Sequence, residues 1–76
     1  MAAALQTTTV INVSQQVIKL LYSMIDVNSW TTTIPPNSAG ELAVMPGTQV
    51  TIETSRLDPG QIKTFTTKGL ITSVTY

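Results

Sequence analysis

The chain has 76 residues, no cysteine and no histidine, and four basic residues against four acidic ones. This length fits one domain, and the missing residue types exclude disulfides and metal sites built from thiolate or imidazole ligands. Only 11% of the residues are charged, well below the usual share of about 25%. The core of so small a domain contributes only roughly 3–5 kcal/mol to the free energy of folding. With disulfides and such metal sites excluded, the remaining sources of stability are a binding partner or a very well-ordered core.

Low charge favours a subunit whose surface is covered by neighbours, because a neutral surface limits the solubility of a free monomer. The alternative is that Ser, Gln and fourteen Thr residues solvate the surface instead. Nucleic acid is an unfavourable partner, since the basic residues form no stripe. No apolar run is long enough to span a membrane, and the start lacks the features of a secretory signal. We therefore expect synthesis in the cytoplasm and no membrane partner.

Residues 1–6 are expected to form a flexible arm, followed by a single small β domain over residues 7–76. Residues 7–13, TTTVINV, are rich in β-branched side chains and predict a strand. Asn12 and Ser14 then supply turn chemistry. We expect this strand and the arm to offer an edge to which a neighbouring strand can add, unless the strand pairs within its own domain.

Residues 15–25 fit two patterns. As a helix capped by Ser14, they carry an apolar stripe made of Val17, Ile18, Leu21 and Ile25. As a strand, they place on one face Ile18, Leu20, Tyr22 and Met24. The β-rich flanking segments favour a strand over residues 16–24, whereas a helix would make the fold α+β.

Two further strands are predicted in the middle of the chain, after a short strand in TTTI and a turn in PNSAG. ELAVM, residues 41–45, and TQVTIET, residues 48–54, alternate as strands do. Pro46 and Gly47 between them fit a tight turn that needs positive φ at the glycine. We expect the two strands to form a β-hairpin, with Glu53 facing the solvent.

A capped helix is predicted near residues 59–68. Asp58 is a candidate N-cap, and Pro59 fits the first helical position. Gln61 stands three residues after the cap, where it can complete a capping box. Gly69 is expected to end the helix in the left-handed conformation.

A last strand is predicted over residues 70–75, which alternate in polarity. A helix of this length is unstable alone, so it must lie on the sheet through Ile62, Phe65 and Leu70. We expect it to close one end of the fold. Together the elements predict a mainly β fold, a small antiparallel β-barrel or sandwich with one short helix.

The residues do not indicate catalysis. Histidine and cysteine are absent, and no base accompanies the six serines. Asp58 is explained as a helix cap and Glu53 as a solvent-facing strand residue, while Asp26 and Glu41 lie in or beside loops. The four glycines stand at separate turns and form no phosphate-binding loop. We therefore expect no enzyme, no metal and no cofactor.

Binding surfaces are better candidates than catalytic sites. Trp30 either covers the core or anchors an interface, since tryptophan is enriched in interface hot spots. Tyr22 and Met24 are candidates for the same surface. Tyr76 is expected to pack either across a subunit boundary or against the sheet edge. Val10, on the first strand, completes the candidate interface.

The second half of the chain resembles small virion proteins of tailed bacteriophages. Those proteins have a Pro/Asn turn, a PG hairpin, an RL…QI helix, a KGLI turn and a last strand. Here these elements lie within IPPNSAGELAVMPGTQVTIETSRLDPGQIKTFTTKGLITSVTY, residues 34–76, a little over half the chain. The earlier NVSQQVIKLLY is similar to their N-x-S-x-Q-x-I strand.

The resemblance implies a non-enzymatic structural component of the virion. As a capsid decoration (cement) protein, the chain would bind the major capsid protein or other virion proteins and stabilise the phage capsid. It would act as a homo-oligomer, with a trimer as one arrangement. The alternatives are a tail, neck or fibre-adaptor protein of the virion, and a small monomeric protein-binding module.

Overall fold

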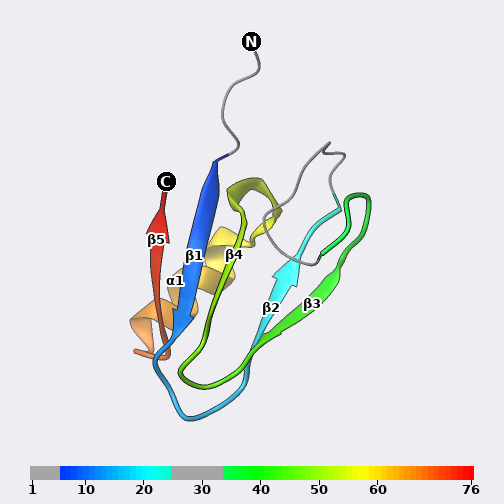
Figure 1. Ribbon diagram of the computed structural model, residues 1–76. Coiled ribbons are helices and arrows are strands. Elements are labelled where there is room, and N and C mark those ends of the chain that lie inside the picture. Colours follow the sequence, from blue (N-terminus) through cyan, green and yellow to red (C-terminus); the bar gives the residue numbers. More distant parts are fainter. Residues whose placement is uncertain (1–5, 25–33) are drawn as a thin grey trace.

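The computed structural model describes residues 6–24 and 34–76 of the chain (Figure 1). It confirms the prediction of a mainly β fold with one short helix. The elements are β1 (Thr7–Asn12), β2 (Ile18–Tyr22), β3 (Gly40–Val44), β4 (Gln49–Glu53), the 3₁₀ turn η1 (Thr54–Arg56), α1 (Pro59–Thr67) and β5 (Ile71–Thr75). The strand expected in TTTI falls largely on residues 31–33, which lie outside the described residues.

The five strands form two antiparallel sheets. One sheet has the order β4-β1-β5, and the other pairs β2 with β3. Figure 1 shows the β2–β3 pair beside the three-stranded sheet, with α1 behind that sheet. Within the described ranges the two sheets do not close into a barrel.

The ambiguous segment around residues 15–25 contains a strand, as the β-rich flanks favoured. Ile18 and Leu20 are buried on one face of β2, opposite Val44 and Leu42 of β3. Leu21, on the other face, is 46% exposed. Because successive strand residues point to opposite sides, only the Ile18 face reaches the core.

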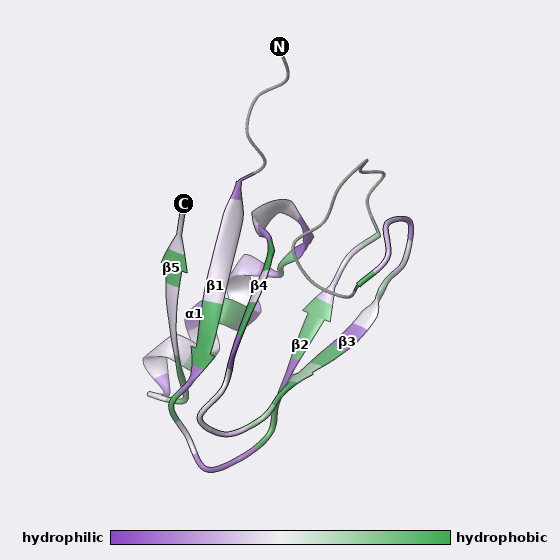
Figure 2. Ribbon diagram, in the orientation of Figure 1, coloured by the Kyte–Doolittle hydropathy of each residue, from purple (hydrophilic) through white to green (hydrophobic). Residues whose placement is uncertain are grey.

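The two sheets and the helix share one core. Its buried members come from four strands, and apolar side chains of α1 pack against them. Figure 2 shows apolar stretches on both sheets. The buried residues are Val10, Ile18, Leu20, Val44 and Ile71. Ile62, Phe65 and Leu70 are partly buried against this cluster, as the sequence predicted.

The predicted hairpin between β3 and β4 is wrong. β3 pairs with β2 and β4 pairs with β1, so the turn carries the chain from one sheet to the other. Gly47 has a φ of 73°, and the Thr48 N–H donates to the Met45 carbonyl at 3.1 Å. Pro46 and Gly47 thus form a turn of type II, whose twist splays the flanking strands instead of joining them as a two-residue hairpin.

Asn12 stabilises the point where the sheets meet. Its fully buried side chain donates from Nδ2 to the carbonyls of Gln16 and Val44, at 2.6 and 2.8 Å. Its Oδ1 accepts from the backbone N–H and the hydroxyl of Ser14, at 2.9 and 2.7 Å. Both donors and both acceptor positions of the amide are therefore occupied. The residue expected to supply turn chemistry also connects β1 to the end of β3.

The helix begins as predicted, with one difference. Asp58 Oδ1 accepts hydrogen bonds from the backbone N–H groups of Gly60 and Gln61, and Pro59 occupies the first helical position. Gly69 follows the helix with a φ of 75°. The predicted capping box is wrong, because the Gln61 side chain does not turn back to the cap.

Gln61 instead connects the helix to the free side of β2. Its Oε1 accepts from the Leu21 N–H at 2.9 Å, and its Nε2 donates to the Lys19 carbonyl at 3.2 Å. A side-chain amide has the same donor and acceptor as a backbone unit, so it satisfies the edge as a short strand would. The helix is therefore held against both sheets, through β5 and through β2.

The expectation that Glu53 faces solvent is also wrong. Its side chain is fully buried, because η1 turns the chain back and places Arg56 over it. Arg56 Nη1 lies 3.7 Å from Glu53 Oε2. A strand residue on the non-core side thus has an ion-pair partner three positions further along the chain.

Candidate functional site

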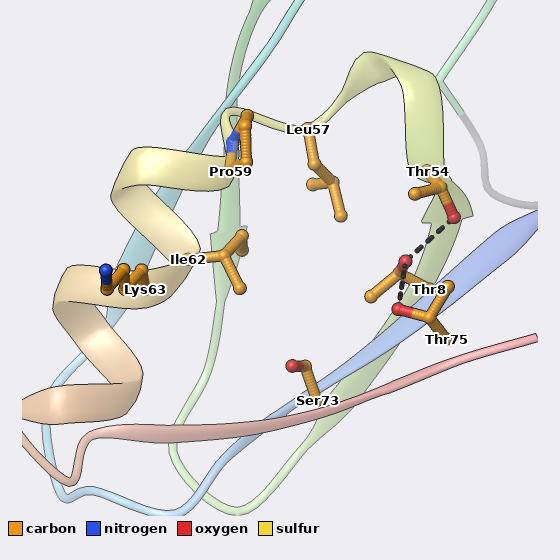
Figure 3. Close-up of a pocket in the computed structure, with 8 residues that line it drawn as sticks. All are labelled: Thr8, Thr54, Leu57, Pro59, Ile62, Lys63, Ser73 and Thr75. Atoms are coloured by element: carbon orange, nitrogen blue, oxygen red, sulfur yellow. Dashed lines mark hydrogen bonds between the residues drawn. The ribbon is translucent and has the colours of Figure 1, made fainter.

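An open pocket lies between α1 and the end of β5 (Figure 3). Its volume is about 360 Å³. One wall is the inner face of the three-stranded sheet, and the other is formed by the start of α1 and the residue that leads into it. The pocket exists because the helix covers the sheet closely near Ile71, which is 1% exposed, but leaves Ser73 and Thr75 exposed.

Hydroxyl groups line the sheet side of the pocket. Thr8 Oγ1 shares a hydrogen bond of 2.8 Å with Thr54 Oγ1 and another of 3.1 Å with Thr75 Oγ1. Figure 3 shows these three side chains gathered at one end of the pocket, with Ser73 apart from them. This wall can form hydrogen bonds, but its hydroxyls have no base beside them to make one of them a nucleophile.

Apolar groups line the helix side. Leu57 and Ile62 point into the space between the helix and the strands (Figure 3), and Pro59 lies between them in the chain. The Asp58 cap sets this arrangement, because it fixes the first helical turn and therefore the direction of Ile62. Lys63 is the only charged residue among those that line the pocket.

Only every second residue of β5 directs its backbone N–H and C=O groups toward β1. The Tyr76 N–H donates to the Thr7 carbonyl at 2.8 Å, and the Val13 N–H donates to the Leu70 carbonyl at 3.0 Å. In an antiparallel ladder of this register, the intervening Thr72 and Val74 also face β1. The N–H and C=O groups of Ser73 and Thr75 therefore point to the outer edge, where the described chain has no further strand.

A second candidate surface is the outer face of the three-stranded sheet along β1 and β5. It carries no charged side chain, and it includes Thr7, Thr9, Ile11, Thr72, Val74 and Tyr76. Val74 is 45% exposed and Tyr76 is 74% exposed. We call these six residues the outer face. Apolar side chains exposed on an uncharged sheet face are typical of a surface that another protein covers.

The predicted interface residues lie in different places. Met24 is 64% exposed and lies just beyond the end of β2. The Tyr22 ring is half-buried and lies 5.2 Å from the Arg56 guanidinium, so its aromatic face has an internal contact. A Cβ at Gly40 would come within 3.2 Å of the Tyr22 hydroxyl, so the ring also packs on β3.

Val10 and the strand that contains it need correction. Val10 is fully buried in the core and offers no surface to a partner. β1 is the central strand of its sheet, so its edges are occupied by β4 and β5 and cannot accept a neighbour's strand. Tyr76 belongs to the outer face. Trp30 lies outside the described residues.

Neither a cluster of metal-binding side chains nor a helix able to span a membrane appears in the described part of the chain. Residues 6–24 and 34–76 contain no group of three or more His, Cys, Asp or Glu that could hold a metal ion. Among the same residues, no helix has the length and apolar character needed to cross a membrane.

No protein-family model, curated protein or solved structure matches the chain.

Sequence reasoning identified Ile62 as a core-facing helix residue but missed the pocket beside it. A signal was present in β5, where Ser73 and Thr75 occupy the same face as the buried Ile71. Where the side chains on one face of a strand change from apolar to polar, the element that packs over that face is expected to end.

Proposed function

We propose that the chain is a non-enzymatic structural subunit of a virus particle, and specifically a capsid decoration protein that binds across neighbouring shell subunits. The uncharged outer face carries this proposal, because it exposes Val74 and Tyr76 on a regular sheet. The resemblance of residues 34–76 to small virion proteins supports a place in a virus particle. The low charge of the whole chain also fits a surface that neighbours cover.

Attachment would come from burial of the outer face against the shell. An aliphatic or aromatic side chain that goes from exposed to buried contributes up to about 1.5–3 kcal/mol. Tyr76 and Val74 are suited to act as the apolar anchors, and the threonines around them as hydrogen-bonding contacts at the rim. A homo-oligomer such as a trimer would multiply these contacts, because linked sites bind with higher avidity than single ones.

A tail, neck or fibre-adaptor protein is the alternative within the particle, since the same surface would serve there in fewer copies. A small monomeric binding module is the alternative outside it. Size-exclusion chromatography with light scattering separates the module from a subunit that assembles with itself.

The proposal is tested with particles that carry variant chains. Val74→Lys places a charge on the outer face, and Leu21→Lys places one on the outward side of β2, at a residue of almost equal exposure. After separation of particles on a density gradient, we expect the Leu21→Lys chain to sediment with them and the Val74→Lys chain to stay with soluble protein. Equal incorporation of both variants would contradict the assignment of the outer face, and absence of the unmodified chain from particles would contradict the function.

A further inference from the structure

Ser73 and Thr75 combine two properties that strand-binding sites require. Their backbone N–H and C=O groups point away from β1, to an edge without a further strand in the described chain. Their side chains line the pocket beside α1. A strand that hydrogen-bonded to this edge would place the side chain opposite Ser73 on the same face of the sheet, and therefore over the pocket.

The edge has none of the features that usually prevent such pairing. β5 reads ITSVT, without proline, lysine or any other charged residue. Natural edge strands are commonly protected by charges, prolines, bulges or a covering element. Ile71 is buried at the start of the strand, whereas Ser73 and Thr75 are exposed.

We infer that the β5 edge and the pocket bind an extended segment of another protein, which adds to the sheet as an antiparallel strand. Backbone hydrogen bonds to Ser73 and Thr75 would hold the segment, and an apolar side chain would enter between Leu57 and Ile62. The segment carries an acidic residue on the same face as that apolar side chain, because Lys63 is the only charged residue that the described chain contributes to the lining.

Charge favours a different protein over two occupants that this chain could supply, the β5 strand of a second copy and residues 1–5. A second copy of β5 brings no carboxylate to Lys63, since the strand has no charged residue. Residues 1–5, MAAAL, contain no acidic side chain either. The inference goes beyond the proposed virion function and does not depend on it, because it rests on β5, Leu57 and α1 alone.

The backbone contact is tested with Ser73→Pro and Ser73→Ala. Proline removes the outward N–H, at an edge position where strands tolerate it, while alanine keeps that group. The probe is a random nonapeptide library displayed on yeast and selected against each purified full chain. We expect the parent and Ser73→Ala to enrich segments that alternate and carry an apolar and an acidic residue on one face. Ser73→Pro should enrich none of them.

The charge contact is tested without any change to the backbone. Lys63→Glu should weaken the enriched peptides by at least about fivefold, and replacing their acidic residue by lysine should restore binding to that variant. This swap decides the question even if Ser73→Pro fails to fold. The matched control is Lys19→Glu, an exposed lysine on β2 away from the pocket.

Three kinds of result would overturn the inference. The first is a failed peptide test, in which no peptide is enriched over the Ser73→Pro background or Lys63→Glu leaves the enriched peptides unaffected. The second is a concentration-dependent dimer that Ser73→Pro abolishes and Ser73→Ala keeps, since the edge would then bind a second copy. The third is that peptides bind only after residues 1–5 are deleted, because the chain's own beginning would then occupy the edge. Failure of the particle experiment would leave all three readouts unchanged.

Discussion

The Arg56 guanidinium lies 3.7 Å from the Glu53 carboxylate, and both side chains are fully buried. Arg56 also donates to three backbone carbonyls, those of Ser23, Pro35 and Ser38, at 2.9, 3.2 and 2.6 Å. One side chain therefore connects the end of β2, the residues that precede β3 and η1. A buried charge is tolerated only when it is paired and hydrogen-bonded, and Arg56 meets both conditions.

The first prediction concerns this buried arginine. Arg56→Ala removes the cation that faces Glu53, and breaking a buried pair in this way costs about 3–5 kcal/mol. A domain of this size has little more stability than that, so we expect the variant to be largely unfolded at 25 °C. Arg56→Lys should be intermediate, because an ammonium group cannot reach three separate carbonyls as the planar guanidinium does.

Urea denaturation followed by circular dichroism measures these differences. The control is Lys19→Ala, which removes an exposed cation and should change the free energy of unfolding by less than about 0.5 kcal/mol. If Arg56→Ala unfolded at the same urea concentration as Lys19→Ala, Arg56 would have no structural role.

The second prediction concerns Asn12. Asn12→Ala removes the fully buried amide that donates to the carbonyls of Gln16 and Val44, and this loss should lower the free energy of unfolding by about 1–3 kcal/mol. Gln15→Ala, at an exposed neighbouring position, serves as the control and should be nearly neutral. Thermal melting compares the two. A melting temperature for Asn12→Ala equal to that of Gln15→Ala would show that the buried amide does not hold the sheets together.

The third prediction compares two glycines. Gly47 has a φ of 73°, so Gly47→Ala forces alanine into the left-handed region and should cost about 1–2 kcal/mol. Gly60 lies in the first turn of α1, where an added Cβ would approach only Asp58 Oδ1, at 3.3 Å. Gly60→Ala should therefore be nearly neutral. Equal destabilisation in urea by both substitutions would refute the special role of the turn between the sheets.

The fourth prediction concerns salt. Attachment through the uncharged outer face should depend only weakly on ionic strength, because screening acts on charged contacts. We expect purified particles to keep most of the chain from about 0.05 M to about 1 M sodium chloride. The amount released into the supernatant at each concentration measures this. Loss of the chain at moderate salt would mean that charged contacts dominate attachment.

Local signals in the sequence predicted the local structure well. The Asp58 cap, the first-turn Pro59 and the left-handed Gly69 have a fixed geometry that depends only on near neighbours, and the helix appears where they place it. The turn at Pro46 and Gly47 was also correct as a turn.

Tertiary contacts between distant parts of the chain were predicted wrongly, because the same local sequence pattern is compatible with several contact partners. Gln61 has the right spacing for a capping box, but the unpaired edge of β2 offers its amide a donor and an acceptor at once. Glu53 alternates as a solvent-facing residue, but Arg56 returns over it after η1. β3 and β4 read as a hairpin, although each finds a better match in another strand. The pocket depends on where the helix stops covering β5, and the change from Ile71 to Ser73 and Thr75 on one strand face marks that point without showing which element lies opposite.

The copy number of the chain in purified virus particles is the decisive test of whether it decorates the capsid. Quantitative mass spectrometry against the major shell protein gives this ratio. For a decoration protein we expect a ratio near one, or a simple fraction set by the symmetry of the shell. A handful of copies per particle would contradict decoration of the shell and move the chain to the neck or tail, and its absence from particles would contradict a structural role in the virion altogether.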